Sequence, residues 1–305
     1  MRFATVRVDA RPTAVLVRPS GELVALESVG FDSLQSLIEA GAAGLARVAA
    51  TLTEAGAGDR HVIGQIEDVR EYLPPLPTTR RNLFCVGSNY RPHMAEGDRP
   101  QGEVPSVPIV FTKPYTSLSG HLSEVPLHPA ATSKVDWEAE IVVVIGTPGI
   151  NIAAESALEH VFGYALGNDV SSRDLQRSGG DSRSQWFKGK SLDGHAPMGP
   201  FVVTPDEVGT PPSIDVELRM NGTLQQKFHS ADMLHSVSSI IAYLSKGMRL
   251  LPGDVIYTGT SSGVGLWHDP PIFLADGDIV EISSPQLGIL SNRFVGRDGA
   301  VEGGE

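Results

Sequence analysis

The segment VDWEAEIVVVIG, residues 135–146, limits the possible folds of this chain more than any other segment. Its second half, residues 141–145, is an uninterrupted run of β-branched side chains, which predicts a buried β-strand. Its first half places Asp136, Glu138 and Glu140 at alternate positions on the way into that strand. Because side chains alternate between the faces of a strand, Glu138 and Glu140 are expected to point to the same side.

Paired carboxylates at the edge of a core need an explanation, because burying them uncompensated raises their pKa or destabilises the fold. One interpretation is the solvated edge of a half-exposed strand, where alternating acids are common. The other is a divalent cation, and oxygen ligands alone favour Mg²⁺, Mn²⁺ or Ca²⁺. Asp169, at the end of a predicted strand at 161–169, is a third candidate ligand. The sequence does not show whether Asp169 lies near the two glutamates.

The composition indicates a soluble globular protein with many tight turns. Apolar residues make up 41% of the 305 residues and charged residues 20%, so a sizeable core can form. The 33 glycines and 22 prolines favour short strands joined by turns over long helices. The formal charge of −12 argues against nucleic acid and anionic membranes as partners. An anionic ligand would therefore need local cations or a metal.

A single cysteine, Cys85, excludes an intrachain disulfide and suits a reducing compartment. It lies in the apolar run 83–86, which predicts a buried and inert thiol. No apolar stretch reaches membrane-spanning length. We therefore expect a cytoplasmic protein.

The fold class predicted from these patterns is α+β, mainly β, and no βαβ alternation supports a Rossmann sheet. Residues 1–73 are predicted to form a small N-terminal α/β domain, with a helix at 33–50 broken by Gly41 and Gly44. The proline-rich segment LPPLPTT predicts a stiff linker at 74–80. The larger domain is expected at 81–296, with a helix capped by Ser230, and a frayed tail at 297–305.

Three partial motif matches do not hold. Residues 189–191, GKS, lack the glycine that a phosphate-binding loop needs, since position 184 is serine. Residues 259–263, GTSSG, match the nucleophile elbow of serine hydrolases, but the following glycine and prolines cannot form the helix that the elbow requires. The nine histidines are scattered, without the pairing typical of a zinc site.

His93 and Glu96 form a candidate general base. Pro92 suits the first turn of a helix, on which positions three apart share a face. A glutamate beside a histidine holds the imidazole in one tautomer and raises its basicity, as proton abstraction requires. The alternative is an ordinary surface pair at the start of a helix.

Taken in order, several blocks between residues 80 and 294 resemble the fumarylacetoacetate hydrolase family. They read CVGSNY from Cys85, WEAE from Trp137, FGYALGNDVSSRDLQ from Phe162, QW at 185–186, GKSLD at 189–193, PMGP at 197–200 and PGDVIYTGT from Pro252. The resemblance implies a mixed β-sandwich roll and, by family habit, a homodimer. It also implies Mg²⁺ or Mn²⁺, with Ca²⁺ as a further possibility, bound by three residues: Glu138, Glu140 and Asp169.

The same resemblance assigns roles to other residues. His93 and Glu96 would activate water on a lid, and Lys190 would lie beside a small anionic 2-oxo acid substrate. The positions that match the substrate pocket of relatives are Tyr90, Lys113, Arg173, Gln176 and Thr260.

Departures from the family pattern bear on the substrate. Ser88 and Asn89 stand where fumarylacetoacetate-cleaving members carry a further acidic ligand, which points to the acylpyruvate-type branch. We therefore expect a metal-dependent hydrolase that cleaves a carbon–carbon bond in an acylpyruvate or related β-diketo acid. Two alternatives on the same fold are a 2-oxo diacid decarboxylase and an isomerase of an unsaturated 2-oxo diacid. An alternative of another class is a metabolite-binding protein without enzymatic activity.

Overall fold

Strand β11 (Ala139–Ile145) carries the β-branched run and is buried on both of its faces. Its residues divide between two hydrophobic cores: Ile141, Val143 and Ile145 on one side, Val142 and Val144 on the other. A strand with one solvated face would alternate apolar and polar residues, whereas a strand covered on both faces reads as continuously apolar. The uninterrupted run therefore reflects the central position of β11.

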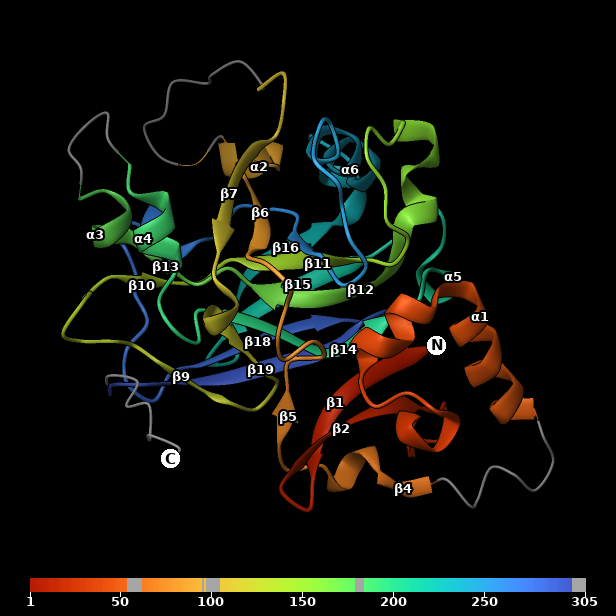
Figure 1. Ribbon diagram of the computed structural model, residues 1–305. Helices are drawn as coiled ribbons and strands as arrows, with labels where there is room; N and C mark the ends of the chain where they lie inside the picture. The colour runs from red at the N-terminus through yellow and green to blue at the C-terminus, as the bar shows by residue number, and fades with distance from the viewer. Residues whose placement is uncertain (54–61, 95, 97–104, 179–183, 298–305) are drawn as a thin grey trace.

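The computed structural model describes residues 1–53, 62–94, 96, 105–178 and 184–297 (Figure 1). β11 belongs to a 12-stranded sheet. In spatial order its main path is β4 (Val62–Gln65), β3 (Glu22–Ala25), β2 (Arg11–Val17), β1 (Arg2–Val8), β14 (Ala196–Val203), β12 (Val161–Asn168), β11, β17 (Val255–Tyr257), β6 (Leu83–Gly87) and β7 (Ile109–Lys113). Two short strands join beside this path, β5 (Tyr72–Leu73) on β1 and β8 (Leu118–Ser119) on β14.

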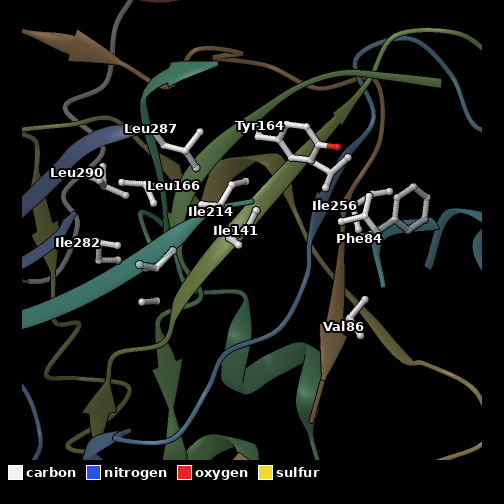
Figure 2. Close-up of a cluster of buried hydrophobic side chains, with 14 of the residues drawn as sticks. Phe84, Val86, Ile141, Tyr164, Leu166, Ile214, Ile256, Ile282, Leu287 and Leu290 are labelled. Carbon is white, nitrogen blue, oxygen red and sulfur yellow. The ribbon is translucent and has the colours of Figure 1, made fainter. Parts of the chain in front are cut away.

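A second sheet covers one face of the first. Its five strands are, in spatial order, β16 (Thr223–His229), β15 (Asp215–Met220), β18 (Ile279–Ser284), β19 (Gly288–Val295) and β9 (Glu124–Pro126). Apolar side chains of β11 and β12, such as Ile141 and Leu166, face Ile282 and Leu290 of the second sheet (Figure 2). A small two-stranded sheet pairs β10 (Val135–Asp136) with β13 (Ser171–Ser172). These findings confirm the mainly β fold with mixed sheets.

The helices are short apart from the first. The α-helices are α1 (Leu34–Thr53), α2 (Arg91–Met94), α3 (Arg173–Gln176), α4 (Trp186–Lys190), α5 (Pro205–Val208) and α6 (Val237–Leu244). The 3₁₀ turns are η1 (Leu26–Val29), η3 (Ile66–Asp68), η4 (Tyr115–Ser117), η5 (Ala154–His160), η6 (Ser230–Asp232) and η7 (Gly265–Trp267). No helix within the described residues is long and apolar enough to cross a membrane.

The N-terminal strands extend the central sheet, because β1 pairs with β14 through Arg2–Val203 and Phe3–Val202. They lie with α1 at one side of the molecule (Figure 1). Within the predicted linker, Leu76 is buried, and the carbonyl of Pro75 accepts a hydrogen bond from Thr5. The strands β1 to β5 thus belong to the same sheet as β14 and β12, and the division into two domains at 74–80 stays a prediction.

Local predictions had mixed outcomes. Gly41 interrupts α1 with non-helical angles, φ 59° and ψ −143°, whereas the second predicted break, at Gly44, is absent. The helix expected to begin at Ser230 begins later, because Ser236 is the residue whose side chain caps α6. Ser230 instead starts the turn η6. Apart from Arg297, the tail predicted at 297–305 lies outside the described residues.

Candidate metal site and cavity

Three buried carboxylates converge where the start of β11 lies beside the end of β12. The strand register pairs Ala139 with Asn168, so Asp169 comes next to Glu138, and the Asp169 amide donates to the Glu138 carbonyl at 2.9 Å. One oxygen each of Glu138, Glu140 and Asp169 lies within 4.8 Å of the others. The convergence that the sequence left open is therefore present.

Glu140 is the carboxylate whose surroundings most require a cation. Its Oε2 accepts a hydrogen bond from the Gly259 amide at 2.7 Å, while its Oε1 is buried without a hydrogen-bond partner. Burial, and then the charges of Asp169 and Glu138, raise the pKa of Glu140 well above its ordinary value. An oxygen-only donor set with an unsatisfied buried oxygen fits a hard divalent cation such as Mg²⁺ or Mn²⁺.

Two buried lysines partly neutralise the other two carboxylates. Lys190 Nζ lies 2.7 Å from Glu138 Oε2 and 2.6 Å from Asp169 Oδ2. Lys113 Nζ donates to Asp169 Oδ1 at 2.6 Å and to the carbonyls of Val170 and His195 at 3.1 and 2.6 Å. An ammonium has three protons, so Lys113 is fully engaged inside the protein.

A buried arginine completes the charge balance. Arg173 Nη2 lies 2.8 Å from Glu138 Oε1 and also 2.8 Å from Asp136 Oδ2. Burial alone would raise the pKa of Glu138, but the cations Lys190, Arg173 and His93 outweigh it and hold that pKa below its ordinary value. The surroundings therefore favour the ionised form of Glu138 and disfavour that of Glu140, and a cation bound beside Glu140 would offset this penalty.

The predicted general base is assembled as a hydrogen-bonded pair. His93 Nδ1 lies 2.6 Å from Glu96 Oε2, and Glu96 Oε1 accepts a hydrogen bond from the Gly263 amide at 2.5 Å. The glycine-rich loop 259–263 thus supports the dyad on one side. A side chain could not replace the glycine at 263, since its Cβ would lie 1.9 Å from the Gln225 carbonyl and the residue has φ +100°.

A cavity of about 420 Å³ is lined in part by His93, Glu138, Arg173 and Lys190. Its lining consists of Val86, Gly87, Ser88, His93, Phe111, Glu138, Arg173, Gln176, Arg177, Ser184, Trp186, Lys190, Thr260, Leu266 and Trp267. Most of these are polar or charged, so the cavity suits a small polar molecule. Two of the three tryptophans of the chain line the cavity, and the third, Trp137, precedes Glu138 and donates through Nε1 to the Gly263 carbonyl at 3.0 Å.

The model of the fumarylacetoacetate (FAA) hydrolase C-terminal domain matches residues 82–295. The chain belongs to the fumarylacetoacetate hydrolase family. It is 43% identical over 220 residues to the oxaloacetate tautomerase YisK of Bacillus subtilis, a match that covers 72% of this chain and 71% of that protein.

Solved structures of the fumarylacetoacetate hydrolase family share the fold along almost the whole chain. The fumarylacetoacetate hydrolase of Exiguobacterium antarcticum is 34% identical, with a TM-score of 0.82 over 97% of this chain and 100% of that one. The maleylpyruvate hydrolase of Sphingobium sp. SYK-6, solved with manganese(II) and pyruvate, is 26% identical, with a TM-score of 0.74 over 97% and 100%.

Most residues singled out by resemblance to the family gather at the cavity. His93, Lys190, Arg173, Gln176 and Thr260 line it together with Glu138, and the other two acids lie close behind. Two others stand apart, because Lys113 and Tyr90 are fully buried and do not line the cavity. Tyr90 packs its ring against Phe228 with centroids 5.0 Å apart. The individual roles of these residues stay predictions.

Several cavity residues of this family member escaped sequence reasoning. Phe111, Leu266 and Trp267 gave no local signal, since ordinary apolar residues acquire a place in a cavity only through the tertiary fold. Asp136 does not line the cavity, but its contacts beside it were also missed. The sequence offered it only as one of three alternating acids, and its carboxylate contacts Arg173 and backbone amides. Its spacing from Glu138 was the only available signal.

Proposed function

We propose that this protein is a divalent-metal-dependent enzyme that interconverts the keto and enol forms of a small 2-oxo dicarboxylic acid of the oxaloacetate type. The observation that carries the proposal is one cavity lined by His93, whose Nδ1 contacts Glu96, together with Glu138 of the acidic triad and the two cations Lys190 and Arg173. The similarity to an oxaloacetate tautomerase at 43% identity supports the same reaction.

The cavity provides positive charge for an anionic substrate. Lys190 and Arg173 line it, and the charged group of each contacts Glu138 of the acidic triad. A 2-oxo acid brings a carboxylate and a ketone oxygen, both of which accept hydrogen bonds from such donors. These contacts offset the net charge of −12, which would otherwise disfavour an anionic ligand.

The pair His93–Glu96 would carry out the proton transfer. Because Nδ1 of His93 is held by Glu96, Nε2 is the ring nitrogen available for exchange with a molecule in the cavity. Tautomerisation moves one proton from carbon 3 to the 2-oxo oxygen and consumes nothing else. His93 would take the carbon-bound proton, and Lys190 would stabilise the negative charge on the ketone oxygen until that oxygen is protonated.

The acidic triad would hold the cation through Glu138, Glu140 and Asp169. A bound Mg²⁺ or Mn²⁺ would supply a Lewis acid that favours the enolate of a 2-oxo acid.

Hydrolysis of a carbon–carbon bond in an acylpyruvate is a second candidate. The same dyad can activate water, and the similar Sphingobium protein is a maleylpyruvate hydrolase. The two reactions differ in their products, since tautomerisation keeps the carbon skeleton and hydrolysis yields pyruvate and a second acid. Decarboxylation of oxaloacetate would instead release carbon dioxide.

A product assay separates these reactions. Purified protein is incubated with Mg²⁺ or Mn²⁺ and either enol-oxaloacetate or an acylpyruvate, and the products are followed by NMR. We expect rapid enol–keto conversion of oxaloacetate that is lost on chelation and in Glu138→Gln. Activity that survives excess chelator would contradict the metal-dependent proposal. Pyruvate formed only from the acylpyruvate would favour hydrolysis, and turnover of neither acid would favour a binding protein.

A further inference from the structure

Asp136 is a fully buried carboxylate whose oxygens all serve the protein itself. Its Oδ1 accepts hydrogen bonds from the amides of Trp137 at 2.8 Å and Gly265 at 2.7 Å. Its Oδ2 accepts from the Leu266 amide at 3.0 Å and from Arg173 Nε at 2.8 Å. Four donors use the usual acceptor capacity of a carboxylate, so Asp136 has no oxygen left for a cation or a substrate.

The strand pairing explains why Asp136 meets Arg173. In the small sheet, β10 pairs with β13 in the register Asp136–Ser171 and Val135–Ser172, and Arg173 follows directly. The guanidinium then lies between two carboxylates of one chain segment, with Nη2 2.8 Å from both Asp136 Oδ2 and Glu138 Oε1. Asp136 therefore shares the arginine with Glu138, one of the three acids of the triad.

The other contacts of Asp136 fix a wall of the cavity. They hold the amides at the start of η7, the turn whose Leu266 and Trp267 line the cavity. Gly265 allows this approach, because a Cβ there would lie 2.8 Å from Asp136 Oδ1 and 2.1 Å from the Ile272 carbonyl. One carboxylate thus joins the arginine on one side of the cavity to the turn on another.

We propose that Asp136 is a positioning residue that sets both the cation affinity and the substrate affinity of the site. Its charge competes with Glu138 for Arg173, whose Nη2 lies 2.8 Å from both carboxylates, and this competition leaves Glu138 able to bind a divalent cation. Its hydrogen bonds keep Leu266 and Trp267 at the distance from Arg173 that the substrate needs. The effect on substrate affinity rests on the proposed function, whereas the effect on cation affinity does not.

The test compares Asp136→Asn with Asp254→Asn, a matched control. Asp254 is also buried and paired with an arginine, Arg81, and it accepts from the Leu251 amide at 2.7 Å, but it does not line the cavity. Mn²⁺ affinity is measured by electron paramagnetic resonance without substrate. We expect Asp136→Asn to weaken Mn²⁺ binding by about 10- to 100-fold and Asp254→Asn to leave it unchanged. Equal affinities in the two variants would overturn the proposal.

A double-mutant cycle tests whether Asp136 acts through Arg173. In an Arg173→Gln background, replacing Asp136 by Asn should cost less than about threefold in Mn²⁺ affinity, because the pair is already broken. If the loss of Mn²⁺ affinity in the double variant equals the product of the losses in the two single variants, the proposal is contradicted. Should Asp136→Asn not fold, Asp136→Glu keeps the charge but displaces the guanidinium, and a smaller loss in the same direction is expected. Turnover is recorded in parallel, so a protein that binds Mn²⁺ normally but converts no 2-oxo acid would refute the proposed function alone.

Discussion

Lys190 Nζ lies 2.6 Å from Asp169 Oδ2, which places a buried ammonium against a carboxylate of the acidic triad. The pKa of Lys190 is raised, because Asp169 and Glu138 outweigh the lowering that burial causes, so the charge is permanent near neutral pH. A cation bound by the triad would share this carboxylate with the ammonium. Lys190 is therefore expected to oppose cation binding and yet to assist the chemistry of a bound anion.

Replacing Lys190 by Met should change these two properties in opposite directions. Mn²⁺ affinity should rise by about tenfold or more, because a like charge is removed from the site. Turnover should fall by on the order of 10²- to 10³-fold, because a donor to the developing negative charge is lost. Isothermal titration and steady-state kinetics check the two outcomes. Lys227→Met, on the exposed side of β16, is the control. A parallel loss of affinity and turnover would contradict the prediction.

Replacing Glu140 by Gln should affect the metal-loaded protein far more than the metal-free one. Burial and the neighbouring carboxylates raise the pKa of Glu140 and so disfavour its charged form without a cation, and a neutral amide is expected to cost little there. A cation at about 100 times its Kd stabilises the native protein by about 2.7 kcal/mol, and the variant should lose most of this gain. Thermal melting with Mn²⁺ and with chelator measures both states. An equally large drop with chelator present would contradict the prediction, and Glu217→Gln on β15 serves as control.

Gly87 leaves room for a tryptophan at the cavity wall. A Cβ at this position would lie 2.6 Å from Trp186 Cζ3, and Trp186 packs edge-on against Phe111 with centroids 5.2 Å apart. Gly87→Ala should therefore displace Trp186 and raise KM by about tenfold or more. If the clash with Trp186 is the cause, adding Trp186→Phe should recover part of the loss. If KM of the double variant rises by more than the product of the two single increases, this explanation is contradicted.

His195 should make the fold sensitive to acid. It is buried, with Nε2 donating to the Pro126 carbonyl at 2.8 Å, and burial lowers its pKa from 6.5 to about 3. Between these values the unfolded chain binds a proton that the folded protein does not, so stability falls as pH decreases from about 6.5 to about 3. The slope is about 1.4 kcal/mol per pH unit.

His195→Gln keeps a donor for Pro126 and should remove that part of the slope. Urea unfolding at a series of pH values measures it, with His160→Gln as the control for replacing a histidine elsewhere. The same loss of slope in both variants would contradict the assignment to His195.

Local sequence was sufficient for the central strand and for the pairing of His93 with Glu96, because both depend on neighbours along the chain. It was not sufficient for the meeting of Asp169 with Glu138, which depends on the register between β11 and β12. Its place at the end of a predicted strand made Asp169 a candidate ligand, but only the resemblance to a family grouped it with the two glutamates. The start of α6 was missed because Ser230 and Ser236 are equally good caps in isolation, and only tertiary packing decides between them.

The charges around the acids were even less predictable. Lys113 was expected to contact substrate, yet its three protons are donated inside the protein. Nothing in the local sequence separates a buried lysine from an exposed one, since the difference arises because the Lys113 side chain reaches Asp169 and Val170, which follow β12, and His195, which precedes β14. The contacts of Asp136 were unpredictable for a similar reason, because its partners lie 37 and 129 residues away.

The placement of the tryptophans gives the protein an optical property. Trp186 and Trp267 line the cavity, Trp137 holds the loop beside it, and the chain has no others. Its intrinsic indole emission therefore originates entirely around this one site. Cation or substrate entry is expected to change the fluorescence of the unlabelled protein, whereas events at the N-terminal strands contribute no signal of their own. Single Trp→Phe replacements would then show which wall of the cavity responds.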